Sequence, residues 1–84
     1  MDEKLTLNDG TELTGHMTET ETRLFVYVWE KTLAEAFALL NDPEKTERIT
    51  GDQYGVVSLA VGYTKLMSIS EEPGGMICAG LKKT

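Results

Sequence analysis

One segment of this chain has the periodicity of an α-helix, and it is short. It begins at a capping box, in which the Thr32 hydroxyl and the Glu35 carboxylate are placed to accept hydrogen bonds from each other's backbone N–H groups. It ends before Pro43, because proline cannot continue the helical hydrogen-bond ladder and restricts the residue before it. The apolar stripe of this helix consists of Leu33, Phe37 and Leu40, with Ala36 and Leu39 alongside. One short helix needs a sheet to cover, so the rest of the chain must supply strands.

Three strands are predicted before the helix. Residues 4–8 and 11–17 alternate apolar with polar positions, and the Asp9-Gly10 dipeptide between them is typical of a tight hairpin turn. Residues 23–29 are apolar on both faces. This pattern is typical of a central strand that a helix covers on one side and a partner on the other.

Three more strands are predicted after the helix. Residues 47–50 favour a short edge strand in a polar stretch. Residues 54–69 alternate over most of their length and predict one extended segment with a bulge or bend at Gly62. A turn at residues 71–75 then precedes a final strand at residues 76–81.

The predicted order is therefore β-β-β-α-β-β-β in a single domain spanning residues 1–84. This order favours the α+β class, with an antiparallel sheet, open or curled toward a small barrel, packed against one short helix. A chain of 84 residues supports one core, and its small size makes self-association a reasonable expectation.

Composition narrows the expected partners and compartment. The formal net charge of −6 opposes direct nucleic-acid binding, which depends on Lys and Arg at phosphates, and it opposes binding to anionic membranes. The N-terminal residues are acidic and lack the apolar core of a signal peptide, and the apolar run 24–29 is too short to cross a bilayer. Cys78 is the only cysteine, so no internal disulfide is possible. We expect a soluble, acidic, cytoplasmic protein.

No catalytic, metal or cofactor site can be recognised in the sequence. His16 is the only histidine, and it falls on the polar face of the second predicted strand with no carboxylate or nucleophile marked beside it. Cys78 has apolar neighbours and is expected to be a small, partly buried side chain. No His, Cys, Asp or Glu set has metal-ligand spacing, and the glycine-containing segments lack a phosphate-loop pattern. The sequence therefore predicts a protein that is not an enzyme and carries no cofactor.

Aromatic side chains mark the candidate interaction surface. Phe25, Tyr27 and Trp29 share one face of the third predicted strand, opposite an aliphatic row. If the helix covers one row, the other is left for another chain, because large exposed apolar patches usually mark interfaces. The same argument applies to Tyr54 and Tyr63. Packing in the core is the first expected use of these side chains and a protein–protein contact the second, whereas stacking of nucleic-acid bases would need more flanking Lys and Arg than this chain has.

Four segments carry a family resemblance. They are Leu7-Asn8-Asp9-Gly10-Thr11, Leu39-Leu40-Asn41-Asp42-Pro43-Glu44-Lys45-Thr46, Gly62-Tyr63-Thr64-Lys65-Leu66 and Ala79-Gly80-Leu81-Lys82-Lys83. In this order they resemble small uncharacterised proteins encoded in bacterial prophages, often among virion-assembly genes. The resemblance spans most of the chain and implies a structural or assembly role, with association to the virion as the alternative to a free cytoplasmic location. Its motifs are turn and strand signatures, so it identifies no functional residue.

These observations leave two function hypotheses. The first is a non-enzymatic protein–protein interaction or assembly module, phage-derived, that binds another protein or a second copy of itself through a sheet face or edge. The alternative is a small acidic inhibitor that occupies a nucleic-acid-binding site on a host protein, which requires the acidic side chains to gather on one face.

Overall fold

Strands make up most of the computed structural model, which describes residues 2–84. Seven of them form one antiparallel sheet in the order β5-β4-β1-β2-β3-β7-β6. The strands are β1 (Glu3–Thr6), β2 (Glu12–Glu19), β3 (Leu24–Val28), β4 (Arg48–Gln53), β5 (Val56–Val61), β6 (Lys65–Glu71) and β7 (Ile77–Lys82). Two helices, α1 (Leu33–Leu40) and the single turn α2 (Pro43–Thr46), lie between β3 and β4 in the chain. The predicted α+β fold, with one short helix packed on an antiparallel sheet, is confirmed.

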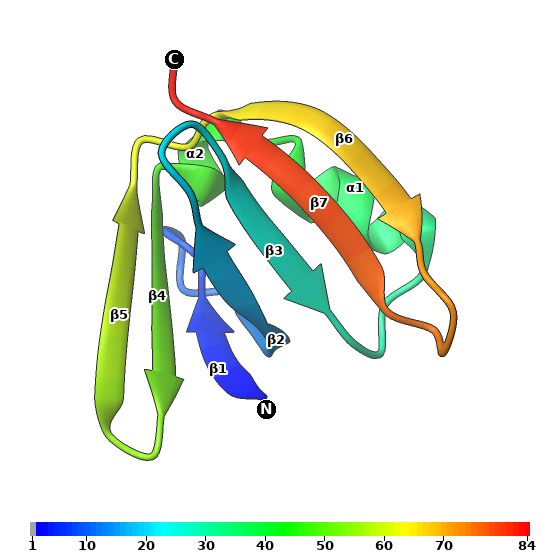
Figure 1. The fold of residues 1–84 in the computed structure, drawn as a ribbon, viewed down its shortest axis with the longest axis horizontal. Helices are drawn as coiled ribbons and strands as arrows, with labels where there is room; N and C mark the ends of the chain where they lie inside the picture. Colours follow the sequence, from blue (N-terminus) through cyan, green and yellow to red (C-terminus); the bar gives the residue numbers. More distant parts are fainter. Residues whose placement is uncertain (1) are drawn as a thin grey trace.

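The sheet is curled into a half-barrel. Residues 62–64 connect β5 at one edge to β6 at the other, so the two edges approach at this end and splay apart at the opposite end (Figure 1). The prediction of one bent strand over residues 54–69 is therefore wrong. Gly62 has φ +86°, a left-handed conformation that turns the chain away from β5, and its N–H donates to the Glu47 carbonyl oxygen at 2.8 Å.

The core lies between the inner face of the sheet and α1, which sits behind β7 and β6 in Figure 1. Alternation along each strand places one row of side chains on this face. On β3, Leu24, Val26 and Val28 are buried, and their register partners on β7 are Leu81, Ala79 and Ile77. The expected half-buried strand pattern is present in β1 and β2 as well, where Leu5 pairs with Leu13.

The capping box predicted for α1 is present. Thr32 Oγ1 accepts a hydrogen bond from the Glu35 N–H at 3.1 Å, and Glu35 Oε1 accepts one from the Thr32 N–H at 2.9 Å. The buried side of α1 differs from the predicted stripe, because Ala36 and Leu40 are buried while Leu33 and Phe37 are 42% and 46% exposed. The helix therefore packs on the sheet through Ala36 and Leu40.

The polar segment after α1 contains a feature that periodicity does not indicate. Asp42 caps a second helical turn, α2, by accepting a hydrogen bond from the Glu44 N–H at 3.1 Å, and Pro43 occupies its first position. Proline thus ends one helix and begins the next. The short edge strand predicted at residues 47–50 is instead β4, which is second from the edge because β5 lies outside it.

Candidate interaction surface

The aromatic row of β3 lies on the outer face of the sheet, opposite α1. Phe25, Tyr27 and Trp29 are half-buried, whereas the aliphatic row on the other side of the strand is fully buried. The indole Nε1 of Trp29 donates a hydrogen bond to Asp2 Oδ1 at 2.8 Å. The row is thus on the uncovered face of the sheet, but the adjacent strands already cover part of each ring.

His16, Tyr27 and Cys78 form a row across β2, β3 and β7 on this outer face. The His16 and Tyr27 rings stack with their centroids 4.4 Å apart and their planes 13° apart. Burial raises the pKa of Cys78, and the Glu72 carboxylate raises it further, while a hydrogen bond with Tyr27 lowers it. The neighbouring charge of Cys78 and burial in turn raise the pKa of Tyr27. The thiolate is the reactive form of cysteine, so a raised pKa leaves less of Cys78 in that form near neutral pH.

His16 and Cys78 do not contact each other in this row. Tyr27 separates His16 from Cys78 by two strand spacings, roughly 10 Å, which is beyond hydrogen-bond reach. Among residues 2–84, no group of three or more His, Cys, Asp or Glu side chains is placed to hold a metal ion.

Tyr63, which the sequence analysis places on the candidate interaction surface, is not exposed. Its side chain is only 3% exposed, and its hydroxyl donates a hydrogen bond to Glu19 Oε2. The Lys83 ammonium lies 5.2 Å from the ring centroid. Tyr63 is therefore a core residue in the connection between the two sheet edges, and its prediction as an interaction residue is corrected.

Tyr54 is the most exposed of the predicted residues. It occupies the tip of the β4–β5 hairpin with 92% of its surface accessible. Tyr54 and Gly55 have φ +52° and +85°, the pattern of a type I′ turn, and Asp52 Oδ1 accepts a hydrogen bond from the Gly55 N–H at 2.9 Å. Three strands separate β5 from β3, so Tyr54 and the aromatic row of β3 do not form one continuous surface.

The largest exposed apolar feature is the edge strand β5, which sequence reasoning did not single out. Within the described chain only β4 pairs with it, and the β4–β5 hairpin extends from the body of the sheet (Figure 1). Val57 and Leu59 on the outer face are 62% and 47% exposed, and Val61 beside them is also exposed. On the inner face Val56 is exposed as well, and within β5 only Ala60 is buried. A signal for this was present in the sequence, since no charged residue occurs in residues 54–64.

The opposite edge strand, β6, has features that discourage strand pairing. Its register against β7 shifts between Leu66 and Ser68, and it carries Lys65 and Glu71 at its two ends. Bulges and charges are the usual means by which proteins protect sheet edges from unwanted partners. β5 has neither, so the two edges of this sheet differ in their capacity to accept another strand.

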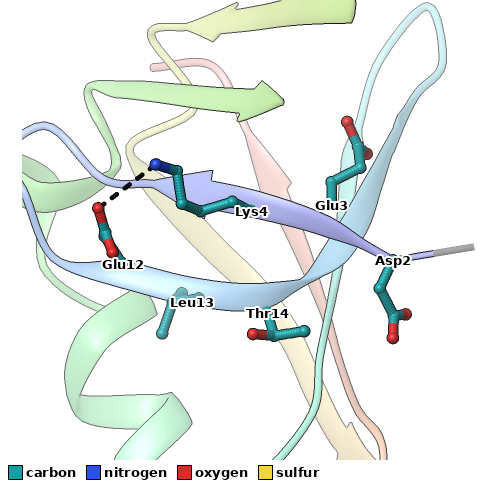
Figure 2. Close-up of a pocket in the computed structure, with 6 residues that line it drawn as sticks. All are labelled: Asp2, Glu3, Lys4, Glu12, Leu13 and Thr14. Carbon is teal, nitrogen blue, oxygen red and sulfur yellow. Dashed lines mark ion pairs between the residues drawn. The ribbon is translucent and has the colours of Figure 1, made fainter. Parts of the chain in front are cut away.

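A shallow hollow lies at the start of β1 and β2. Figure 2 shows its lining residues, Asp2, Glu3, Lys4, Glu12, Leu13 and Thr14. Lys4 Nζ lies 3.6 Å from Glu12 Oε2, while the Asp2 and Glu3 carboxylates point away from this pair. Both partners of the ion pair are more than half exposed, so it contributes little to fixing a ligand-binding geometry. The hollow offers no convergent set of buried polar groups of the kind that ligand sites contain.

Comparisons with protein-family models, with curated proteins and with solved structures found no match for this chain. In residues 2–84, neither helix has the length and apolar character needed to cross a membrane.

Proposed function

We propose that this chain is a non-enzymatic protein–protein interaction module that accepts a strand from another polypeptide along β5. The observation that carries the proposal is an edge strand with aliphatic side chains exposed on both faces and no charged residue. An added strand would satisfy the free backbone N–H and C=O groups of this edge and cover Val57, Leu59 and Val61. The exposed ring of Tyr54 at the adjoining hairpin tip would extend the contact.

The resemblance to prophage-encoded proteins favours an assembly role for such a module. Structural phage proteins act by contact with neighbouring chains, which agrees with a small domain whose distinguishing feature is an unprotected edge. The outer face of β3, with Phe25 and Tyr27, is a secondary surface that a larger partner could reach.

The acidic-inhibitor alternative has less support. It requires carboxylates on one face, but Glu12 and Asp52 are on the outer face of the sheet while Glu3 is on the inner face. Asp9 and Asp42 are both paired with Lys45, at 3.2 and 3.3 Å. We therefore propose the interaction module alone.

Photo-crosslinking in cells tests the proposal. A photoreactive amino acid replaces Val57 on β5 in one variant and Met67 on β6 in a matched variant, since these side chains are 62% and 43% exposed. We expect a covalent adduct to a polypeptide from position 57 and little or none from position 67. Absence of any adduct at position 57, or equal capture from both positions, would contradict the proposed function.

A further inference from the structure

We propose that the partner of β5 is β5 of a second copy of this chain, paired antiparallel so that the two sheets become one. This inference rests on the proposed function and specifies its partner. Antiparallel pairing of one strand with itself generates a two-fold axis, the commonest symmetry of homo-oligomers.

The order of side chains on the outer face is self-complementary. Val57, Leu59 and Val61 form a pattern that is the same in both directions about Leu59. With Leu59 opposite Leu59 of the second copy, Val57 of each copy lies opposite Val61 of the other. On the outer face, the three exposed aliphatic side chains of each copy then have aliphatic partners, which is the kind of cross-strand pair that stabilises sheets. Shifting this pairing by two residues in either direction leaves part of the row without a partner.

The charges beside β5 agree with the same register. On the outer face, Arg48 of β4 is the neighbour of Val61, and Asp52 of β4 is the neighbour of Val57. In the joined sheet, each row that contains Val57 of one copy and Val61 of the other therefore has Asp52 at one end and Arg48 at the other. No like charges meet across the join, although each chain carries a formal net charge of −6. A strand without charged residues is where two such acidic chains approach with least repulsion.

The contact is small, and this sets the expected affinity. A single strand edge buries less than the roughly 1,600 Å² of a standard interface, so the dimer belongs to the weaker class. We expect a dissociation constant in the micromolar range, on the order of 1–100 μM.

The first test is the solution mass measured by light scattering behind a sizing column across this range of concentrations. We expect a concentration-dependent dimer for the wild type. Leu59→Lys places two ammonium groups opposite each other and is expected to weaken the dimer by about tenfold or more. Met67→Lys, on an equally exposed residue of the other edge strand, is expected to leave it unchanged.

Cysteine cross-linking tests the register in a Cys78→Ser background. Directly opposed residues of an antiparallel pair have Cα atoms about 4.5–5.5 Å apart, within the range that a disulfide spans. Mixed Val57→Cys and Val61→Cys chains should therefore form an intermolecular disulfide. Each variant alone should not, because its own copies are offset by four residues, roughly 13 Å.

The outcomes separate this inference from the proposed function. A wild type that stays monomeric with no mixed disulfide overturns the self-pairing. A dimer insensitive to Leu59→Lys overturns it as well, by assigning the contact elsewhere. In either case, an adduct from position 57 to a different protein would leave the proposed function standing, whereas absence of that adduct would remove both.

Discussion

The Tyr63 hydroxyl donates a hydrogen bond to the Glu19 carboxylate across 44 residues of sequence. This bond joins the connection between β5 and β6 to the end of β2, in the middle of the sheet. The Tyr63 side chain is also buried in the core. Its packing and its hydrogen bond therefore fix the connection between β5 and β6 against the sheet, at the end where the two edges approach. The curl of the sheet, and with it the position of β5, therefore depends on a contact that is distant in sequence.

Replacing Tyr63 by Phe should remove this hydrogen bond while keeping the ring in the core. We expect a loss of about 1 kcal/mol in the free energy of unfolding, because the exposed Glu19 carboxylate is hydrated in the variant. Chemical denaturation measures the loss, and Tyr63→Ala should cost about 3–5 kcal/mol by leaving a cavity. A Tyr63→Phe variant with unchanged stability would contradict the assigned bond.

The free energy of unfolding of the wild type and that of Tyr63→Phe should depend differently on pH. The hydrogen bond to Glu19, and then burial, raise the pKa of Tyr63 above its ordinary value of 10.0. Its contribution is therefore present in full below about pH 10 and is lost as the pH rises through the folded-state pKa. The wild type should lose more stability than Tyr63→Phe across this alkaline range, while Tyr27 affects both proteins equally.

Gly15 is expected to be the least replaceable residue of β2. It is the point at which β2 pairs with both Glu3 of β1 and Val28 of β3, and a methyl group there would lie 1.7 Å from the Tyr27 carbonyl oxygen. Gly15→Ala should therefore cost more than about 3 kcal/mol or prevent folding.

Gly51→Ala is the control for Gly15→Ala, because the nearest neighbours of its methyl group would be the movable side-chain ends of Glu3 and Ser58, at 2.6 and 2.7 Å, and not backbone. It should cost about 1 kcal/mol or less. Denaturation midpoints in the reverse order would contradict the close backbone approach at Gly15.

The sequence correctly predicts those turns, caps and strands that depend on contacts between residues close together in the chain. The Asp9-Gly10 turn, the Thr32–Glu35 capping box and the alternation of strands each depend on neighbours in sequence, and each is present. The break at Gly62 is not visible in the sequence because alternation continues on both sides of it, and only strand pairing shows that the two halves belong to opposite edges of the sheet. The burial of Tyr63 is hidden in the sequence for the same reason. Tyr63 lies at the end of the half-barrel where the two sheet edges approach, and that end is formed by contacts between residues distant in sequence. The exposure of β5 likewise follows from its place at the edge, which the order of strands along the chain does not reveal.

Tyr54 should be replaceable with a gain in stability. Its left-handed conformation, with φ +52°, is unfavourable for tyrosine and favourable for asparagine in a type I′ turn. Tyr54→Asn should therefore raise the free energy of unfolding by about 1 kcal/mol, since the exposed ring has little packing to lose. Tyr54→Ala, which keeps the unfavourable conformation, should show no such gain in thermal or chemical denaturation. Equal effects of the two substitutions would argue against backbone strain at this turn.

Asp9 should contribute to the loss of folding stability at acidic pH. Hydrogen bonds from the Thr11 backbone N–H and hydroxyl, and then Lys45, lower the pKa of Asp9 from 3.8 to about 2. Because this pKa is depressed in the folded state, the stabilisation is present above about pH 4 and is lost as the pH falls through about 2. Asp9→Asn keeps a turn acceptor for the Thr11 N–H but removes the titration, so urea midpoints of the two proteins should converge between pH 4 and pH 2. Parallel curves over this range would refute the assignment.

Cys78 should react slowly with thiol reagents in the folded protein. Burial, and then the Glu72 carboxylate, raise the pKa of this thiol, so less of the reactive thiolate is present at pH 8 than in the unfolded chain. We expect alkylation by iodoacetamide to be slower than in denaturant, and faster in Glu72→Gln than in the wild type. Glu71→Gln is the matched control, since Glu71 points to the inner face of β6 opposite Ile77. A folded-state rate above that of the unfolded chain would instead indicate an activated thiol, and would reopen a catalytic role for the row of His16, Tyr27 and Cys78.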